Sequence, residues 1–118
     1  MAEVTILHNK SCGSSRNALA IVEDSGADFE VVEYLKNKPD REFLTRLVGI
    51  LDGPVEDLVR KDARFAKLGL NPEDYTTPGA VVDLLVDETA LLQRPIVIKG
   101  DRAVIGRPKE RVSELLAE

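Results

Sequence analysis

The chain contains one cysteine, one histidine and no tryptophan among its 118 residues. A single cysteine, Cys12, cannot form an intramolecular disulfide or a thiolate metal site, so the sequence excludes the disulfide framework of a small secreted protein. Any redox chemistry at Cys12 must therefore take its second thiol from another molecule. We expect no metal and no tightly bound cofactor.

Positive charge and long apolar runs are also scarce. The chain has 16 lysines and arginines but 21 aspartates and glutamates. The resulting net charge of −5 argues against nucleic acid or an anionic membrane as the main partner. No apolar stretch approaches the ~20 residues that a membrane span needs, and the N-terminus lacks a signal-peptide pattern, so we expect a cytoplasmic protein. With 43% hydrophobic and 31% charged residues, the chain fits one globular domain over residues 1–118.

The first third of the chain has the pattern of a strand, a helix and a second strand. Residues 3–7 are β-branched and apolar, and residues 14–26 carry apolar side chains on one helical face before ending at Gly26. Residues 28–35, DFEVVEYL, have the pattern of a second strand. This order is typical of a βαβ unit, whose two strands are parallel.

The last quarter of the chain predicts a hairpin and a helix. Residues 95–100 and 102–106 flank the turn signal Gly100-Asp101, and residues 108–118 form an amphipathic helix that opens with Pro108. Between these halves, about 36–93, we expect a helical insertion with three segments: 41–51 after an Asp40 cap, 54–61 and 78–88. The sequence thus predicts an α/β fold with a β-α-β half, a helical insertion and a β-β-α half.

The stretch HNKSCGSSRNAL places Cys12 in a polar loop between the first strand and the first helix. Unpaired backbone N–H groups at a helix N-terminus stabilise a thiolate, so we expect the pKa of Cys12 to lie below the ~8.5 of a free thiol. Five nearby residues are candidates to support the thiolate through charge, hydrogen bonds or a close backbone approach: His8, Gly13, Ser14, Ser15 and Arg16.

Simpler interpretations exist for the same residues. A lone cysteine is most often an inert buried side chain, His8 taken alone fits a loop hydrogen-bond donor better than a catalytic base, and the two serines fit helix caps. Two known thiol motifs are excluded. A C-x-x-C dithiol would need a cysteine at Ser15, and a phosphatase-type loop would need an arginine at Ala18. A monothiol site remains.

Four blocks in order along the chain resemble the glutaredoxin-linked (ArsC-like) arsenate reductase family: HNKSCGSSRNAL, LVRK (58–61), QRPIVI (93–98) and IGRP (105–108). The resemblance implies a thioredoxin-like (glutaredoxin-like) core carrying a helical insertion. It also implies that Cys12 is the nucleophile and that Arg60, Arg94 and Arg107 bind the oxyanion. Pro95 is implied to be a cis-proline facing the cysteine, although only about one X-Pro bond in twenty is cis.

The implied chemistry is physically coherent. Arsenate is a tetrahedral anion, and guanidinium groups bind such anions through bidentate, charge-assisted hydrogen bonds. Cys12 would attack arsenic, and glutathione and glutaredoxin would supply the external thiols that complete reduction to arsenite. Lys10 departs from the family pattern, which often has proline there, and we expect no counterpart of the C-terminal extension that is common in the family.

Two other functions fit parts of the pattern. An Spx-like transcription regulator shares the fold and a similar RPI block, but it binds RNA polymerase and has no need of Arg60 and Arg107. A thiol oxidoreductase of the same fold could use the arginines to bind glutathione carboxylates, with no role for arsenic. The arginines themselves could be ordinary surface charges, and Arg60 fits this best because Lys61 beside it suggests an exposed helix end.

Overall fold

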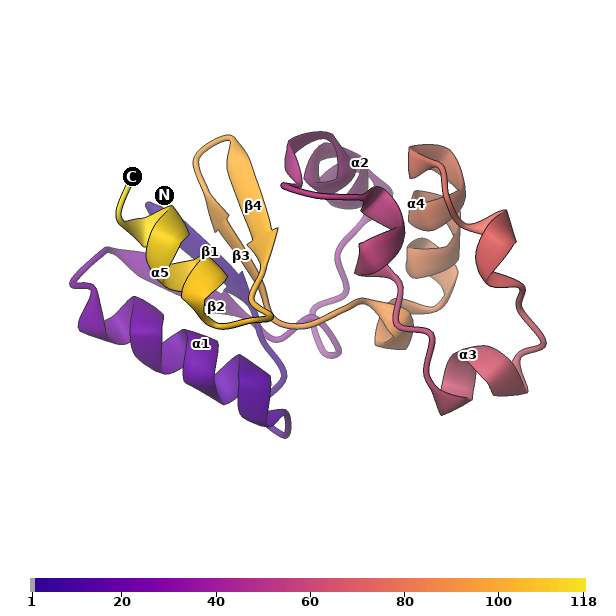
Figure 1. Cartoon of the computed structure of the whole chain (residues 1–118), viewed down its shortest axis with the longest axis horizontal. Helices are drawn as coiled ribbons and strands as arrows, with labels where there is room; N and C mark the ends of the chain where they lie inside the picture. Colours follow the sequence, from indigo (N-terminus) through magenta and orange to yellow (C-terminus); the bar gives the residue numbers. More distant parts are fainter. Residues whose placement is uncertain (1) are drawn as a thin grey trace. The chain divides into compact units, whose positions relative to one another are not determined.

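The computed structural model describes residues 2–118 and divides into two compact units. One unit combines the residues up to Asn37 with Arg94–Glu118, and the other comprises Lys38–Gln93. The first unit contains a four-stranded sheet with two helices, and the second is built from helices (Figure 1). The α/β class predicted from the sequence is confirmed. No helix within residues 2–118 is long and apolar enough to cross a membrane.

The sheet has the strand order β2-β1-β3-β4. Its strands are β1 (Val4–Leu7), β2 (Phe29–Val32), β3 (Ile96–Lys99) and β4 (Arg102–Ile105). β1 is parallel to β2 and antiparallel to β3, which is antiparallel to β4. Leu7 pairs with both Val32 and Ile96, and Ile96 pairs with Ile105. The ends of β1, β2 and β4 and the start of β3 therefore lie at one edge of the sheet.

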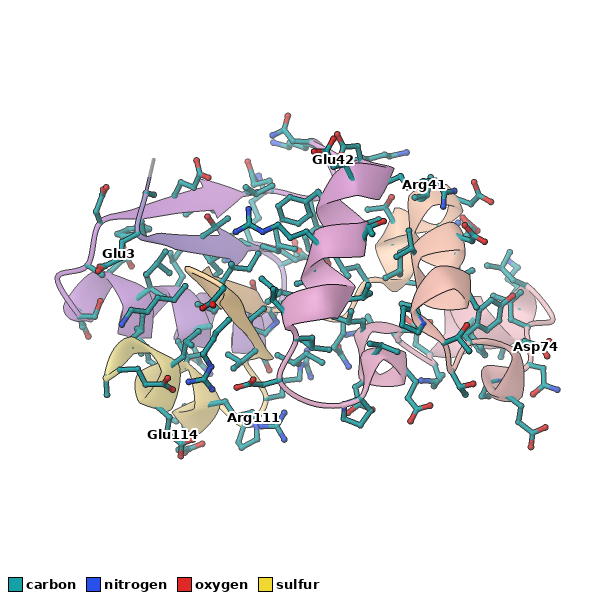
Figure 2. All side chains as sticks on the ribbon, turned by 90° about the horizontal axis from the view of Figure 1, so that it is seen from above. Glu3, Arg41, Glu42, Asp74, Arg111 and Glu114 are labelled. Atoms are coloured by element: carbon teal, nitrogen blue, oxygen red, sulfur yellow. The ribbon has the colours of Figure 1, made fainter. Side chains whose placement is uncertain are left out.

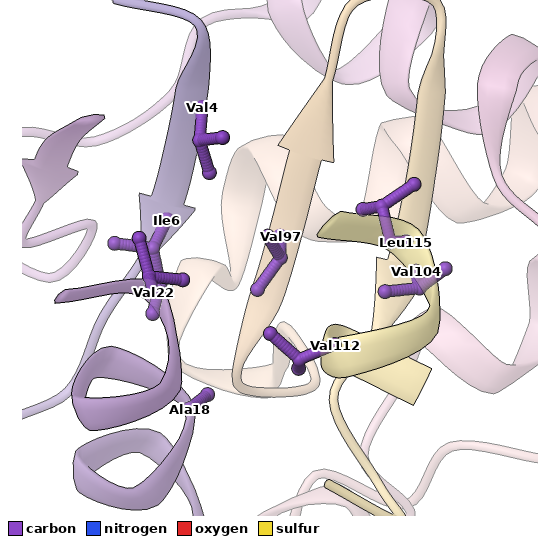
Figure 3. Packing of buried hydrophobic residues seen from close by; sticks show 8 residues of the cluster. All are labelled: Val4, Ile6, Ala18, Val22, Val97, Val104, Val112 and Leu115. Carbon is purple, nitrogen blue, oxygen red and sulfur yellow. The ribbon is translucent and has the colours of Figure 1, made fainter. Parts of the chain in front are cut away.

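Helices α1 (Gly13–Asp24) and α5 (Glu110–Leu116) pack against one face of this sheet (Figures 1 and 3). Alternate strand residues face these helices, as the two-residue period of a strand requires. The cluster that they form comprises Val4, Ile6, Ala18, Val22, Val97, Val104, Val112 and Leu115. On the outer side of α5, Arg111 and Glu114 are exposed (Figure 2). This core fixes where β1 and α1 meet, which is the position of Cys12.

The second unit contains α2 (Arg41–Ile50), α3 (Ala63–Lys67) and α4 (Pro78–Asp87). Asp40 accepts a hydrogen bond from the backbone N–H of Phe43 at 2.8 Å, and Thr77 accepts one from Ala80 at 3.3 Å. These caps start α2 and α4 where the sequence predicted. Three short 3-10 helices complete the unit: η1 (Val55–Leu58), η2 (Pro72–Asp74) and η3 (Thr89–Leu91).

Three predicted elements differ clearly in extent from those in the structure. The strand expected over 28–35 ends at Val32, the helix expected over 54–61 is only η1, and the helix expected to open with Pro108 begins at Glu110. Helix α3 was not predicted, because its five residues are too few for a clear helical pattern.

The shortened helix after Pro54 has a tertiary cause. Val59 forms an isolated antiparallel bridge with Leu92, the N–H of Arg60 donates to Leu91 O at 2.7 Å, and that of Gln93 donates to Leu58 O at 2.7 Å. These long-range bonds take backbone groups that a continuing helix would use, so the chain at Arg60 is extended. The prediction that Arg60 lies at an exposed helix end is therefore wrong.

Candidate active site

Cys12 is the N-cap residue of α1 and has extended backbone angles, φ −102° and ψ 124°. Its N–H donates to Asn9 O at 3.0 Å, and its carbonyl accepts the first helical bond from Arg16 N at 3.0 Å. Asn9 closes the preceding turn by accepting from Ser11 N at 3.0 Å. The thiol is partly buried, so it is both held and accessible.

The pKa of the Cys12 thiol is lowered from its ordinary value. Burial, the largest influence, acts in the opposite direction, but it is outweighed by hydrogen bonds from the backbone of Ser15, the side chain of Arg94 and the backbone of Ser14. The charge of Arg94 lowers the pKa further. Amides of the first helical turn and one guanidinium therefore act together to favour the thiolate.

Arg107 makes the direct contact to the sulfur. Its Nη2 lies 3.3 Å from Cys12 Sγ, and its Nε donates to the backbone oxygen of Arg94 at 2.7 Å. The bond to Arg94 O fixes the guanidinium plane, while the other edge faces the thiol. Arg107 is thus oriented by a neutral backbone acceptor rather than by a carboxylate.

Arg94 lies at the start of β3, next to the same thiol. Burial lowers the pKa of its guanidinium, but a hydrogen bond with Cys12 and the electrostatic effect of Tyr34 raise it by more. The peptide bond between Arg94 and Pro95 is cis, as the resemblance implied, and the bond between Arg107 and Pro108 is cis as well. Each strand end thus presents one arginine followed by a cis-proline at the edge that holds Cys12.

His8 and Ser15 are occupied with each other. His8 Nδ1 lies 2.7 Å from Ser15 Oγ, which also accepts from Asn9 N at 3.0 Å, and both side chains are buried. The hydroxyl of Ser15 therefore ties the first turn of α1 to the end of β1, while its backbone N–H serves the thiolate. This geometry assigns His8 to loop support, the simpler of the two interpretations from the sequence.

The remaining loop candidates differ in what they contact. Arg16 Nη1 donates to Lys10 O at 2.9 Å, so the Arg16 side chain also stabilises the loop that precedes Cys12. Gly13 has room for a side chain, because an added Cβ would meet only Arg16 Nη2, at 3.8 Å. Within the described chain, nothing at Gly13 requires a glycine.

Arg60 belongs to the other unit, Lys38–Gln93. Its Nε lies 3.4 Å from Asp62 Oδ2, its Nη1 donates to Gln93 Oε1 at 3.2 Å, and its side chain is 21% exposed. Burial tends to raise the pKa of Asp62, but the backbone N–H of Phe65 and the guanidinium of Arg60 lower it overall. A role for Arg60 at Cys12 stays a prediction from the resemblance.

Two residues at the Cys12 edge were not identified from the sequence. Gly106 donates its N–H to Pro95 O at 2.9 Å, and a Cβ there would lie 2.7 Å from Pro95 Cγ. Tyr34 is fully buried and influences Arg94. Two features of the sequence could have pointed to them: Gly106 stands directly before Arg107-Pro108, and Tyr34 stands near the end of the predicted strand 28–35.

A small pocket adjoins the site. It has a volume of about 280 Å³ and is lined by Ser14, Asn17, Gly106, Arg107, Pro108 and Lys109. Since Arg107 also contacts Cys12, the pocket begins beside the thiol and carries two cationic side chains. Among residues 2–118 there is no cluster of three or more histidine, cysteine or acidic side chains that could hold a metal ion.

Comparison with known proteins gives a consistent picture. The sequence profile described as the ArsC family matches residues 7–115. An arsenate reductase of Acidiphilium multivorum is 35% identical over 119 residues, which cover 100% of this chain and 84% of that protein. An arsenate reductase of Neisseria meningitidis serogroup A is 36% identical over 118 residues, covering 98% of this chain and 100% of that protein. The solved structure of an arsenate reductase from Vibrio cholerae has a TM-score of 0.84 at 32% identity and covers 96% of this chain and 97% of that chain.

Proposed function

Because the chain belongs to the ArsC family, we propose that it is an arsenate reductase in which Cys12 is the nucleophile. The observation that carries the proposal is the contact between Arg107 Nη2 and Cys12 Sγ at 3.3 Å, at a thiol whose pKa is lowered. A thiolate and an oxyanion repel each other, and only a cationic site brings them together. Arg94 and Arg107 supply that charge on the Cys12 side, and Arg60 is the third proposed ligand.

The first step forms a bond between sulfur and arsenic. The Cys12 thiolate attacks arsenic, and one arsenate oxygen leaves as water after protonation, so arsenic remains As(V). The guanidinium groups stabilise the charge that builds up on the arsenate oxygens during attack, as oxyanion-binding donors do in other group-transfer reactions.

Reduction then uses two external thiols, since the chain has only Cys12. We propose glutathione as the first: its thiol attacks arsenic in the Cys12 adduct and displaces a second arsenate oxygen as water, so arsenic is still As(V). We propose glutaredoxin as the second: its thiolate attacks the glutathione sulfur, and the bond between that sulfur and arsenic breaks with its electron pair left on arsenic. The two thiols leave as a mixed disulfide and give arsenic two electrons. Hydrolysis of the remaining sulfur–arsenic bond releases arsenite and returns Cys12 as a thiolate.

The pocket beside Arg107 is the place we propose for glutathione. Arg107 and Lys109 complement the carboxylates of glutathione, and Ser14 and Asn17 offer hydrogen-bonding groups to its peptide.

A reduced glutathione pool is a feature of the cytoplasm, so we propose a cytoplasmic location. No bound cofactor is needed in this scheme.

The experiment that tests the proposal measures arsenate-dependent NADPH consumption with glutathione, glutaredoxin and glutathione reductase. The wild type should turn over, Cys12→Ser should not, and Lys109→Ala should raise the KM for glutathione more than that for arsenate. Wild-type protein without activity, or Cys12→Ser with full activity, would rule the proposal out. Turnover of a glutathione mixed disulfide without arsenate would favour the general thiol oxidoreductase instead.

A further inference from the structure

Tyr34 reaches the Cys12 edge of the sheet from a strand that the proposed mechanism does not use. It lies two residues beyond the end of β2, whose last residue, Val32, accepts from His8 N at 2.9 Å. The chain then turns, because Lys36 N and Asn37 N both donate to Glu33 O at 2.9 Å. The parallel pairing of β1 and β2 therefore brings Tyr34 to the edge where Cys12 and Arg94 lie.

The hydroxyl of Tyr34 is exceptional in this protein. The side chain is 0% exposed, and within residues 2–118 its Oη has no hydrogen-bond partner at ordinary geometry. Buried hydroxyl groups are nearly always hydrogen-bonded, and one without a partner destabilises the fold. If packing were its only role, phenylalanine would fill the same space without that penalty.

The neighbour of Tyr34 indicates what is missing. Burial lowers the pKa of the Arg94 guanidinium, and hydrogen bonds with Cys12 and Tyr34, together with their electrostatic effects, raise it. The phenol oxygen is therefore within reach of the guanidinium, although not at ordinary hydrogen-bond geometry. A guanidinium group carries only donors, so it can serve the phenol oxygen but never accept from the phenol O–H. The hydroxyl hydrogen thus needs an acceptor, and an anion bound by Arg94 would provide one.

We propose that Tyr34 is a substrate-binding residue whose hydroxyl donates a hydrogen bond to an oxygen of the tetrahedral oxyanion held by Arg94 and Arg107 beside Cys12. The inference rests on the proposed function for the identity of the anion. The O–H group is buried, and no acceptor within residues 2–118 lies at ordinary hydrogen-bond geometry to it. The binding energy of the anion is increased because this donor needs no desolvation when the anion arrives.

The test compares two tyrosine variants. Tyr34→Phe removes only the hydroxyl, and Tyr75→Phe is the matched control, because Tyr75 is the only other tyrosine and belongs to the other unit, where it packs on Phe65. Arsenate binding is measured by calorimetry in a Cys12→Ser background, where no covalent step follows. We expect Tyr34→Phe to weaken binding about 10-fold or more, as for a lost hydrogen bond to a charged group, with an unchanged or higher Tm. Tyr75→Phe should bind like the parent.

Two outcomes contradict the proposal. Equal affinity in Tyr34→Phe would show that the hydroxyl does not touch the anion, and a loss of affinity together with a lowered Tm would assign Tyr34 to packing. The chain has no tryptophan and two tyrosines, so Tyr34 is the one tyrosine left to fluoresce in the Tyr75→Phe protein. Its emission should change on addition of arsenate. Absence of turnover with intact arsenate binding would overturn the proposed function and leave Tyr34 as an anion ligand.

Discussion

The Cys12 edge of the sheet and the segment around Arg60 both hold an arginine in place, but by opposite means. Arg107 is oriented by a neutral backbone oxygen and directs Nη2 at the sulfur. Arg60 faces the carboxylate of Asp62 and the amide of Gln93. A neutral acceptor leaves the positive charge available, whereas a carboxylate compensates it. The comparison teaches that arginines from equally matching sequence blocks need not offer an anion the same charge.

The largest expected effect follows from removing the positive charge of Arg107. Arg107→Ala should lower kcat/KM for arsenate about 10²- to 10³-fold, the loss typical of one oxyanion donor. Arg107→Lys should recover only part of it, because an ammonium cannot reproduce the planar fork. Steady-state kinetics checks both, with the exposed Arg111→Ala on α5 as the control. Equal losses in Arg107→Ala and Arg111→Ala would mean that only net charge matters.

The next effect concerns the packing that holds the Cys12 edge together. Gly106→Ala places a methyl group 2.7 Å from Pro95 Cγ and 3.0 Å from Val112 Cγ2, so it should cost about 1–3 kcal/mol of unfolding free energy. Gly13→Ala, where the Cβ would have 3.8 Å of room, should be neutral or stabilising, since alanine favours a helix. Urea unfolding of both variants measures the difference. Similar stabilities would show that the hairpin end can shift freely.

Arg60→Ala should have a smaller effect than Arg107→Ala, about 10-fold in kcat/KM, because its charge is partly compensated. Asp62→Asn sharpens the comparison. Asparagine keeps the cap that Asp62 gives to α3 through Arg64 N and Phe65 N while removing the charge, so the KM for arsenate should fall. A KM that rises in Asp62→Asn would show that Asp62 serves to position Arg60.

The smallest expected effect is a shift in the pH at which Cys12 becomes reactive. Amides of α1 and the guanidinium of Arg94 lower the pKa of Cys12 against the opposing effect of burial, so alkylation by iodoacetamide should reach half its maximal rate below the ~8.5 of a free thiol. Arg94→Ala removes a cation from the thiolate and must move this midpoint upward, whereas Arg60→Ala should leave it in place. A midpoint unaffected by Arg94→Ala would leave the helix amides as the cause.

The elements with strong local patterns were the ones that the sequence could predict. Short apolar runs identified β1, β3 and β4, the Asp40 cap marked the start of α2, and the helix expected over 78–88 corresponds to α4, because caps and periodicity act over a few residues. The failures had long-range causes. The helix around Arg60 was lost to backbone bonds with residues some thirty positions away: Gln93 N donates to Leu58 O, and Arg60 N donates to Leu91 O.

The candidate site shows the same division. Cys12 was identifiable because its turn and helix start are local, and the two Arg-Pro pairs were identifiable from motif blocks. Tyr34 was overlooked because it falls within the segment predicted as the second strand, 28–35, and resembles an ordinary strand residue. Only the register between β1 and β2 shows that the chain has already left the sheet at that point.

The register of the β3–β4 hairpin also limits which sequence changes are tolerated far from Cys12 Sγ. Arg94 and Arg107 meet because Ile96 pairs with Ile105, and this pairing is fixed by the turn at Gly100, whose φ of 61° suits a glycine, at the opposite end of the two strands. One residue added to that turn would slip β4 by one position and turn its side chains to the other face. The bond from Arg107 Nε to Arg94 O would then be lost. Turn length at one end of the hairpin therefore determines how Arg94 and Arg107 meet at the other.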